Sequence, residues 1–256
     1  MQNLVVEIKR KPELRDLPDN LVEEAISSYL KKQKIQIPKS PQSRKVIVKE
    51  IRAQLRSLTG QYKFKSSSRK ISKIIEKEDF AQALNLHKST KERLNDYELV
   101  KKIISSLNPK SVLDLGCGLN PLAIATSKIF YHAYDIKSED LEIVKLFFEK
   151  NKISGDIHHA DIRAVNNFPQ VDLCLMFKLL DILGNDKSEI AESLIKKINA
   201  KYFIISFATR TLSGKSMNRP YRRWFENIIN DLHLKYEIIK TNQEMFYIIT
   251  KDFKLK

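Results

Sequence analysis

The stretch VLDLGCG, residues 112–118, decides the fold. An apolar run interrupted by one aspartate leads into a turn that has glycine at positions 116 and 118. Glycine adopts positive φ readily and, having no Cβ atom, lets a ligand approach the backbone closely. A helix-length segment starts at Pro121. Strand, glycine turn and helix in this order predict a βα unit whose turn can face a ligand, and a tight turn with a purely structural role is the alternative.

The segments around this unit alternate in the same way. Apolar runs of strand length are separated by segments of helix length, which is typical of α/β proteins with a largely parallel sheet. We therefore predict an α/β fold with a Rossmann-like sheet that ends in two closing strands. The further strand segments are 130–136, 155–162, 171–177, 201–208, 235–241 and 244–250.

The N-terminal part of the chain has helical periodicity instead. Apolar residues at helical spacing predict helices over residues 21–32 and 44–58. We predict two domains, a smaller basic helical domain over residues 1–100 and an α/β domain over residues 101–256.

The net charge of +15 is concentrated in one part of the 256-residue chain. Residues 31–75 hold 14 basic residues and a single acid. This excess of basic residues predicts a surface that binds a polyanion such as nucleic acid. The alternative is a solvated basic face that aids solubility. The candidate RNA-binding residues lie on one predicted helix and are Lys45, Lys49, Arg52 and Arg56.

Several other classes are excluded by composition. The longest apolar run, residues 202–208, is far shorter than the roughly 18 residues of a membrane-spanning helix, and no signal peptide is evident. We expect a cytoplasmic protein. Two cysteines, Cys117 and Cys174, cannot form a multi-cysteine zinc site. His158 and His159 are adjacent and point apart on a strand, so we predict no metal site.

The glycine turn predicts the cofactor. It lacks the third glycine of the dinucleotide fingerprint, and no Gly-Lys-Ser/Thr of a P-loop follows it. D-x-G-C-G after a strand is instead the first motif of S-adenosylmethionine-dependent class I methyltransferases. Asp135, at the end of the second strand, can accept hydrogen bonds from both ribose hydroxyls, or it caps the next helix. Asp161, after the third strand, can accept from the adenine amino group, or it is a loop carboxylate.

Longer motifs give the chain a family resemblance. They are HKSTKERL at 87–94, LGCGLNPLA at 115–123, CLMFKLLDIL at 174–183, ISFATRTLSGK at 205–215, YRRWFE at 221–226 and NQEMFYII at 242–249. With them the chain resembles the aminoglycoside-resistance 16S rRNA methyltransferases of the Arm/Rmt type, which modify N7 of guanine 1405. The resemblance covers about residues 55–250. It implies S-adenosyl-L-methionine as cofactor and the assembled 30S subunit as substrate, and we expect a monomer.

The resemblance implies roles for individual residues. Arg93 matches the arginine that pairs with the methionine carboxylate of the cofactor, an anion that suits a guanidinium fork, although a helix-surface charge is the alternative. Phe177 matches an apolar position near adenine, and core packing at a strand end explains it as well. The other cofactor-binding candidates are Tyr62, His87, Lys88, Ser89, Gly116, Gly118, Asp135, Asp161 and Ile162.

The expected chemistry needs no acid–base residue. Guanine N7 carries an in-plane lone pair that is free at neutral pH, so catalysis would consist of positioning a guanine that is flipped out of its stack. The candidate pocket residues for this base are Lys178, Arg210, Tyr221 and Trp224. Trp224 can equally be a core residue, and the two basic residues could contact only phosphate.

The chain departs from the family pattern on the expected RNA-facing side. Asp181 and Ala208 stand where the family has proline, and the loop over residues 215–221 is about two residues shorter. These changes lie outside the cofactor motifs and bear on the target nucleotide and the resistance phenotype. Two rival hypotheses stay open. One is a methyltransferase for another rRNA or tRNA nucleotide, and the other is a catalytically silent ribosome-binding or assembly factor.

Overall fold

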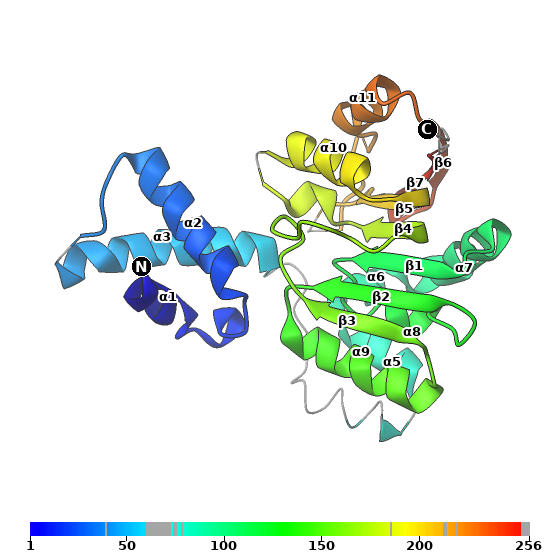
Figure 1. The fold of residues 1–256 in the computed structure, drawn as a ribbon, viewed down its shortest axis with the longest axis horizontal. Coiled ribbons are helices and arrows are strands. Elements are labelled where there is room, and N and C mark those ends of the chain that lie inside the picture. The colour runs from blue at the N-terminus through cyan, green and yellow to red at the C-terminus, as the bar shows by residue number, and fades with distance from the viewer. Residues whose placement is uncertain are drawn as a thin grey trace.

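The computed structural model describes residues 1–38, 40–59, 73, 76, 77, 79–184, 186–211, 214–218 and 220–251 of the chain. Figure 1 shows a small group of helices at the N-terminus beside a larger α/β part that is built on one twisted sheet. The predicted α/β class with a helical N-terminal region is confirmed. Among the described residues, no helix is long and apolar enough to cross a membrane.

One seven-stranded sheet forms the centre of the α/β part, in the order β3-β2-β1-β4-β5-β7-β6. The first five strands pair in parallel, and β7 lies antiparallel between β5 and β6. Parallel strands place their carboxyl ends at one edge, and the order reverses direction between β1 and β4, where ligands bind in such folds. The strand bounds are β1 Ser111–Leu115, β2 Phe130–Asp135, β3 Gly155–His159, β4 Val171–Phe177, β5 Ala200–Ala208, β6 Lys235–Lys240 and β7 Glu244–Thr250.

Helices cover both faces of the sheet, as the near-continuous burial of β1 and β4 requires. On one face the apolar core includes residues of α5 (Phe80–Leu86), α7 (Tyr97–Leu107), α8 (Pro121–Ile124) and α9 (Ser138–Asn151). On the other face it includes residues of α10 (Lys187–Lys197) and α11 (Arg223–Asp231). Because α5 and α7 share a core with the sheet, the sequence boundary at residue 100 divides one packed unit.

The N-terminal helices have a core of their own. Helices α1 (Gln2–Lys9), α2 (Asp19–Gln33) and α3 (Pro41–Thr59) bury 13 apolar residues together with the short turn around Leu14. Ile136, just after β2, packs against this core, and Glu24 of α2 lies 3.2 Å from the guanidinium of Arg163. The two parts therefore meet beside the carboxyl ends of β2 and β3.

Candidate active site

The glycine turn after β1 is built as the sequence predicts. Gly116 and Gly118 both have positive φ, +66° and +49°. The positive φ disfavours any other residue at Gly116, and a Cβ atom there would also lie 2.9 Å from Cδ1 of Leu179. The Cys117 amide donates to the carbonyl of Tyr134 over 3.0 Å, which ties the turn to the end of β2.

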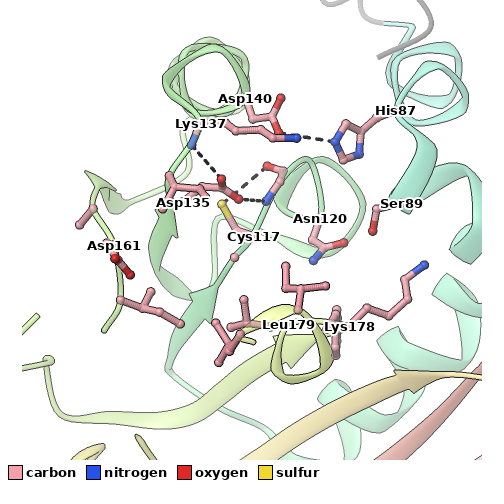
Figure 2. Close-up of a pocket in the computed structure, with 18 of the residues that line it drawn as sticks. His87, Ser89, Cys117, Asn120, Asp135, Lys137, Asp140, Asp161, Lys178 and Leu179 are labelled. Atoms are coloured by element: carbon pink, nitrogen blue, oxygen red, sulfur yellow. Dashed lines mark hydrogen bonds and ion pairs between the residues drawn. The ribbon is translucent and has the colours of Figure 1, made fainter. Parts of the chain in front are cut away.

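A cavity of about 870 Å³ opens at this turn and is called the first cavity below. Most of its surface is apolar, as is usual for small-molecule sites. Figure 2 shows Asp161 on one side of it, Asp135 and the turn in the middle, and Ser89 and Lys178 on the opposite side. Its lining includes these predicted cofactor residues: His87, Ser89, Gly116, Gly118, Asp135, Asp161, Ile162 and Phe177.

Asp135 lies at the centre of the first cavity. One carboxylate oxygen accepts from the Gly118 amide over 2.8 Å and the other accepts from the Lys137 amide over 2.9 Å. Burial raises the pKa of Asp135, and the nearby Asp140 raises it further. Each oxygen keeps a second lone pair, so a carboxylate held in this way can still accept hydrogen bonds from a diol.

Asp161 is held by a residue that the sequence analysis does not single out. Both of its carboxylate oxygens accept from the Arg163 guanidinium, at 2.6 to 3.1 Å. The Arg163 side chain lines the first cavity and also reaches Glu24 of α2. The adenine side of the predicted site therefore combines a carboxylate with a fixed orientation and a contact to the N-terminal helices.

Arg93 does not line the first cavity, because its charge is used inside the protein. It is fully buried in α6 (Lys88–Arg93), and its guanidinium contacts both Glu244 carboxylate oxygens at 2.9 and 3.0 Å. Burial lowers the pKa of Arg93, but Glu244 and Tyr97 together outweigh burial and hold the pKa above its usual value. Arg93 also donates to the Asn120 side chain over 2.6 Å, and Asn120 does line the cavity.

Of the other predicted cofactor residues, some line the first cavity and one lines a neighbouring cavity. His87 is buried, with Nε2 3.5 Å from Asp140, whereas Lys88 lines a neighbouring cavity instead of the first. Phe177 lines the first cavity and stacks under the Arg93 guanidinium at 4.6 Å, so it has both a core and a cavity contact. Tyr62 lies outside the described residues.

Lys178 separates the first cavity from a second one. It follows β4 in the left-handed region at φ +52°, and its amide donates to the Ser206 carbonyl over 3.0 Å. Its ammonium lies 2.7 Å from the Glu92 carboxylate and 3.5 Å from that of Glu244. The second cavity, of about 1170 Å³, is lined by Lys88, Glu92, Lys178, Asp181, Ile182, Ala208, Arg210, Thr211, Gly214, Met217 and Gln243.

Only two of the four predicted target-base residues line the second cavity. Arg210 does, although its guanidinium also donates to the carbonyls of Asn242 and Gly214, both at 3.0 Å. Tyr221 is exposed and does not line it. Trp224 packs edge-on against Phe207 and Phe225, so its core alternative fits the structure better.

Residues at the positions that depart from the family pattern contact neighbouring side chains and backbone. The Asp181 carboxylate accepts from Arg222 over 2.8 Å and lies 3.8 Å from the Lys187 ammonium. It thereby links the turn after β4 to the segment before α11. Ser216 forms an isolated bridge with Arg210. The altered positions thus border the second cavity and leave the first one intact.

Several lining residues of the first cavity besides Arg163 are missed by the sequence analysis. Asn120, Lys137 and Asp140 follow strand ends, where a position-by-position search of the loops after β1 and β2 could have found them. Leu21 also lines the cavity, but it lies on α2 and has the same helical spacing as its core neighbours. Nothing in its sequence context distinguishes it.

Together these features define a class of protein. A doubly wound parallel sheet with an antiparallel β7, a glycine turn after β1 and an acid at the end of β2 are typical of nucleoside-cofactor-dependent methyltransferases. The donors and acceptors in the first cavity fit such a cofactor, since Asp135 faces it and the glycine backbone leaves it open.

Comparisons with known proteins name the family. A model of the ribosomal RNA methyltransferase (FmrO) family matches residues 76–248, and the chain belongs to this family. The sequence is 33% identical over 221 residues to the 16S rRNA (guanine(1405)-N(7))-methyltransferase of Serratia marcescens, covering 84% of this chain and 86% of that protein. The enzyme of the same name from Proteus mirabilis is 28% identical and covers 91% and 98%.

Solved structures agree with this assignment. The 16S rRNA methylase RmtB superposes with a TM-score of 0.81 at 26% identity and covers 98% of both chains. The 16S rRNA methyltransferase RmtF, solved in complex with S-adenosyl-L-homocysteine, has the same fold with a TM-score of 0.80 at 23% identity. The family predicted from the motifs is confirmed.

Proposed function

We propose that this protein methylates N7 of guanine 1405 of 16S rRNA in the 30S subunit, with S-adenosyl-L-methionine as cofactor. The observation that carries the proposal is the pair of cavities that share Lys178 and Ile182 at the carboxyl ends of the strands. One cavity has the features of a nucleoside cofactor site, and the other is open enough to admit a base. The relatives named above act on this nucleotide.

The first cavity would hold the cofactor through residues of four loops. Asp135 would accept from the ribose, Asp161 from the adenine amino group, and Ile162 and Phe177 would pack against the ring. Asn120 would meet the amino-acid end, and Arg93 would orient Asn120 from behind. When bound, S-adenosylmethionine supplies an electrophilic methyl group on sulfur. The chain contributes by fixing these positions and excluding water.

The second cavity would receive the flipped guanine. Lys178 reaches both cavities, and its ammonium is held by Glu92 and Glu244, so it can donate to a base edge without an unpaired buried charge. Arg210 lies on the same cavity wall. Burial raises the pKa of both thiols, Cys117 and Cys174, so neither would act as a nucleophile. Methylation of N7 needs no proton acceptor.

Helix α3 would dock the enzyme on rRNA, with a narrower set of contacts than the sequence predicts. Lys45 and Lys49 are exposed and one helical turn apart. Arg52 instead donates to the carbonyls of Glu7 and Ile8, and Arg56 pairs with Glu13 at 2.9 Å. The two lysines would contact phosphates, whereas the two arginines would hold the N-terminal helices together.

The proposal also includes the oligomeric state of the enzyme, its location and the resistance that it would give. It would act as a monomer in the cytoplasm, and a modified decoding region would protect a bacterial host against gentamicin and kanamycin. We propose the intact 30S subunit as substrate because a base site and a docking helix on separate parts of the molecule suit a large, preformed surface.

Transfer of a labelled methyl group tests the proposal. The purified protein is incubated with 30S subunits and methyl-labelled S-adenosylmethionine, and label in 16S rRNA is counted. We expect incorporation with wild type and a loss of at least tenfold with Asp135→Ala, because the cofactor loses an acceptor at the centre of its site. Wild type that binds 30S but transfers no label would support the silent-factor hypothesis instead.

A further inference from the structure

A cluster of metal-ligating side chains lies outside both cavities, on strands β2 and β3. In the register of this parallel pair, His132 is directly opposite Asp156. His158 lies two residues further along β3, so Asp156 and His158 project from the same face of the sheet. One potential ligand atom from each of the three residues lies within 4.8 Å of the other two.

We propose that His132, Asp156 and His158 bind a divalent transition-metal ion of the Zn²⁺ type. Two imidazoles and one carboxylate are a donor set that suits Zn²⁺, with a remaining position for water. With ligands about 2.1 Å from a tetrahedral ion, ligand atoms are about 3.4 Å apart. Nδ1 of His132 and Oδ2 of Asp156 are 3.3 Å apart, which matches this edge of a tetrahedron.

Only small side-chain movements are needed to bring all three ligand atoms to the spacing of a bound ion. The His158 ligand atom has to approach by roughly 1.4 Å at most if the ligand spacing of a tetrahedral ion is to be met. The Asp156 side chain is 54% exposed and can rotate toward it. The two imidazoles are already restrained, since His132 lies against Phe130 with ring centres 4.9 Å apart and His158 stacks on Tyr134 at 4.2 Å.

One ring nitrogen of the cluster, Nδ1 of His132, has Asp156 as its near polar neighbour. Among the described residues, Nδ1 of His132 is buried and accepts or donates no hydrogen bond, although Asp156 is close. A buried ring nitrogen in this state loses free energy unless an ion or water satisfies it. The pair thus has the spacing of metal ligands without the alignment of a hydrogen bond.

The bound ion would stabilise the pairing of β3, the strand at the edge of the sheet, with β2. β3 pairs only with β2 in the sheet and leads directly to Ala160 and Asp161, which line the first cavity. Joining His132 to residues on β3 would restrain that edge. The role is structural and does not depend on the methyl-transfer proposal. In sequence His158 is next to His159, whereas the pairing of β2 with β3 places its ligand atom within 4.8 Å of that of His132.

Zinc titration of the full chain tests this site. The protein, freed of any histidine tag and stripped with EDTA, is titrated with ZnCl₂ in a calorimeter. The variants Asp156→Asn and His158→Gln remove ligands and keep side-chain size. His159→Gln is the matched control, because His159 is adjacent and exposed and lies outside the cluster. Far-UV circular dichroism verifies that each variant is folded.

We expect one Zn²⁺ per chain, with affinity at least tenfold weaker in both ligand variants and unchanged in His159→Gln. Wild type should also unfold at a higher temperature with Zn²⁺ than with EDTA, and the ligand variants should not. Co²⁺ in place of Zn²⁺ should give visible absorption bands of a four-coordinate site. No binding by wild type at 100 µM ZnCl₂, on the order of the affinity of a weak site, would overturn the proposal. Equal binding by folded ligand variants would do the same.

Discussion

At the scale of single residues, the buried charged side chains behind the first cavity form one connected group. Glu244 accepts from Arg93 and from the Ser206 hydroxyl, and it also lies near the Lys178 ammonium. Burial raises the pKa of Glu244, but Arg93 and Lys178 outweigh burial and hold it below its usual value. The carboxylate is thus charged at neutral pH, and it lies beside Lys178, which lines both cavities.

Removing either partner of the Arg93–Glu244 pair should therefore be costly. We expect Arg93→Ala and Glu244→Ala each to lower the free energy of unfolding by about 3–5 kcal/mol, because each leaves a buried charge unpaired. The double variant should lose clearly less than the sum of the two. Urea denaturation of the three variants measures this. Additive losses would mean that the pair is not coupled in the folded protein.

Asp114 gives a pH-dependent prediction. It is fully buried in β1 and accepts from the Tyr131 hydroxyl, and burial raises its pKa to about 7. The folded state then keeps a proton that the unfolded chain releases above about pH 4, so stability falls as pH rises from about 4 to 7. The total effect is of the order of 4 kcal/mol.

Asp114→Asn should remove this dependence. We expect the variant to gain free energy of unfolding relative to wild type at pH 8 and to gain little at pH 4.5. Chemical denaturation at both pH values measures the difference, and Asp231→Asn, at an exposed carboxylate, is the control. A gain that is equal at the two pH values would show that Asp114 is ionised in the folded protein.

At the scale of elements, α2 reaches the adenine side of the first cavity. Arg163 is held between Asp161 and Glu24, and the Glu24 carboxylate is about half exposed. We expect Arg163→Ala to weaken S-adenosylmethionine affinity by about tenfold, because Asp161 loses its charge-assisted bonds and its orientation. Glu24→Gln should stay within a few-fold of wild type, since exposed pairs contribute little. Calorimetry that gives equal affinities for all three proteins would contradict this role.

Helix α3 provides a second test at this scale. We expect the double variant Lys45→Glu and Lys49→Glu to bind 30S subunits weakly, with a less steep dependence on salt, because fewer counterions are released. Its S-adenosylmethionine affinity should not change. Lys102→Glu with Lys145→Glu, on exposed positions of α7 and α9, makes the same change of net charge elsewhere. Equal losses in both double variants would indicate a nonspecific charge effect.

At the scale of the whole molecule, local patterns predict the fold well. Strand β4, which is apolar except for Asp172, and the glycine turn after β1 can be predicted because their signals lie within a few residues. The position of Asp135 beside that turn follows from chain order in a parallel sheet. These features need no knowledge of distant contacts.

Contacts between distant residues could not be predicted in the same way. Glu244 is 151 positions from Arg93, and no spacing rule connects them. For the same reason the basic residues of α3 look equivalent in sequence, yet Arg52 and Arg56 are engaged by α1 and its following turn while Lys45 and Lys49 are free for a partner. Tyr221 and Trp224 lie outside the lining of the second cavity, and the sequence alone does not show which residues line a cavity.

The position of the new methyl group on 16S rRNA tests the central claim most directly. Subunits methylated by the protein are treated with borohydride and aniline, which cleave RNA at N7-methylguanosine, and the break is mapped by primer extension. Wild type with S-adenosylmethionine should give one new stop, at guanine 1405. Subunits incubated without cofactor, or with Asp135→Ala, should give none. A cofactor-dependent stop at a different nucleotide, or label in rRNA without aniline cleavage, would contradict N7 methylation of guanine 1405.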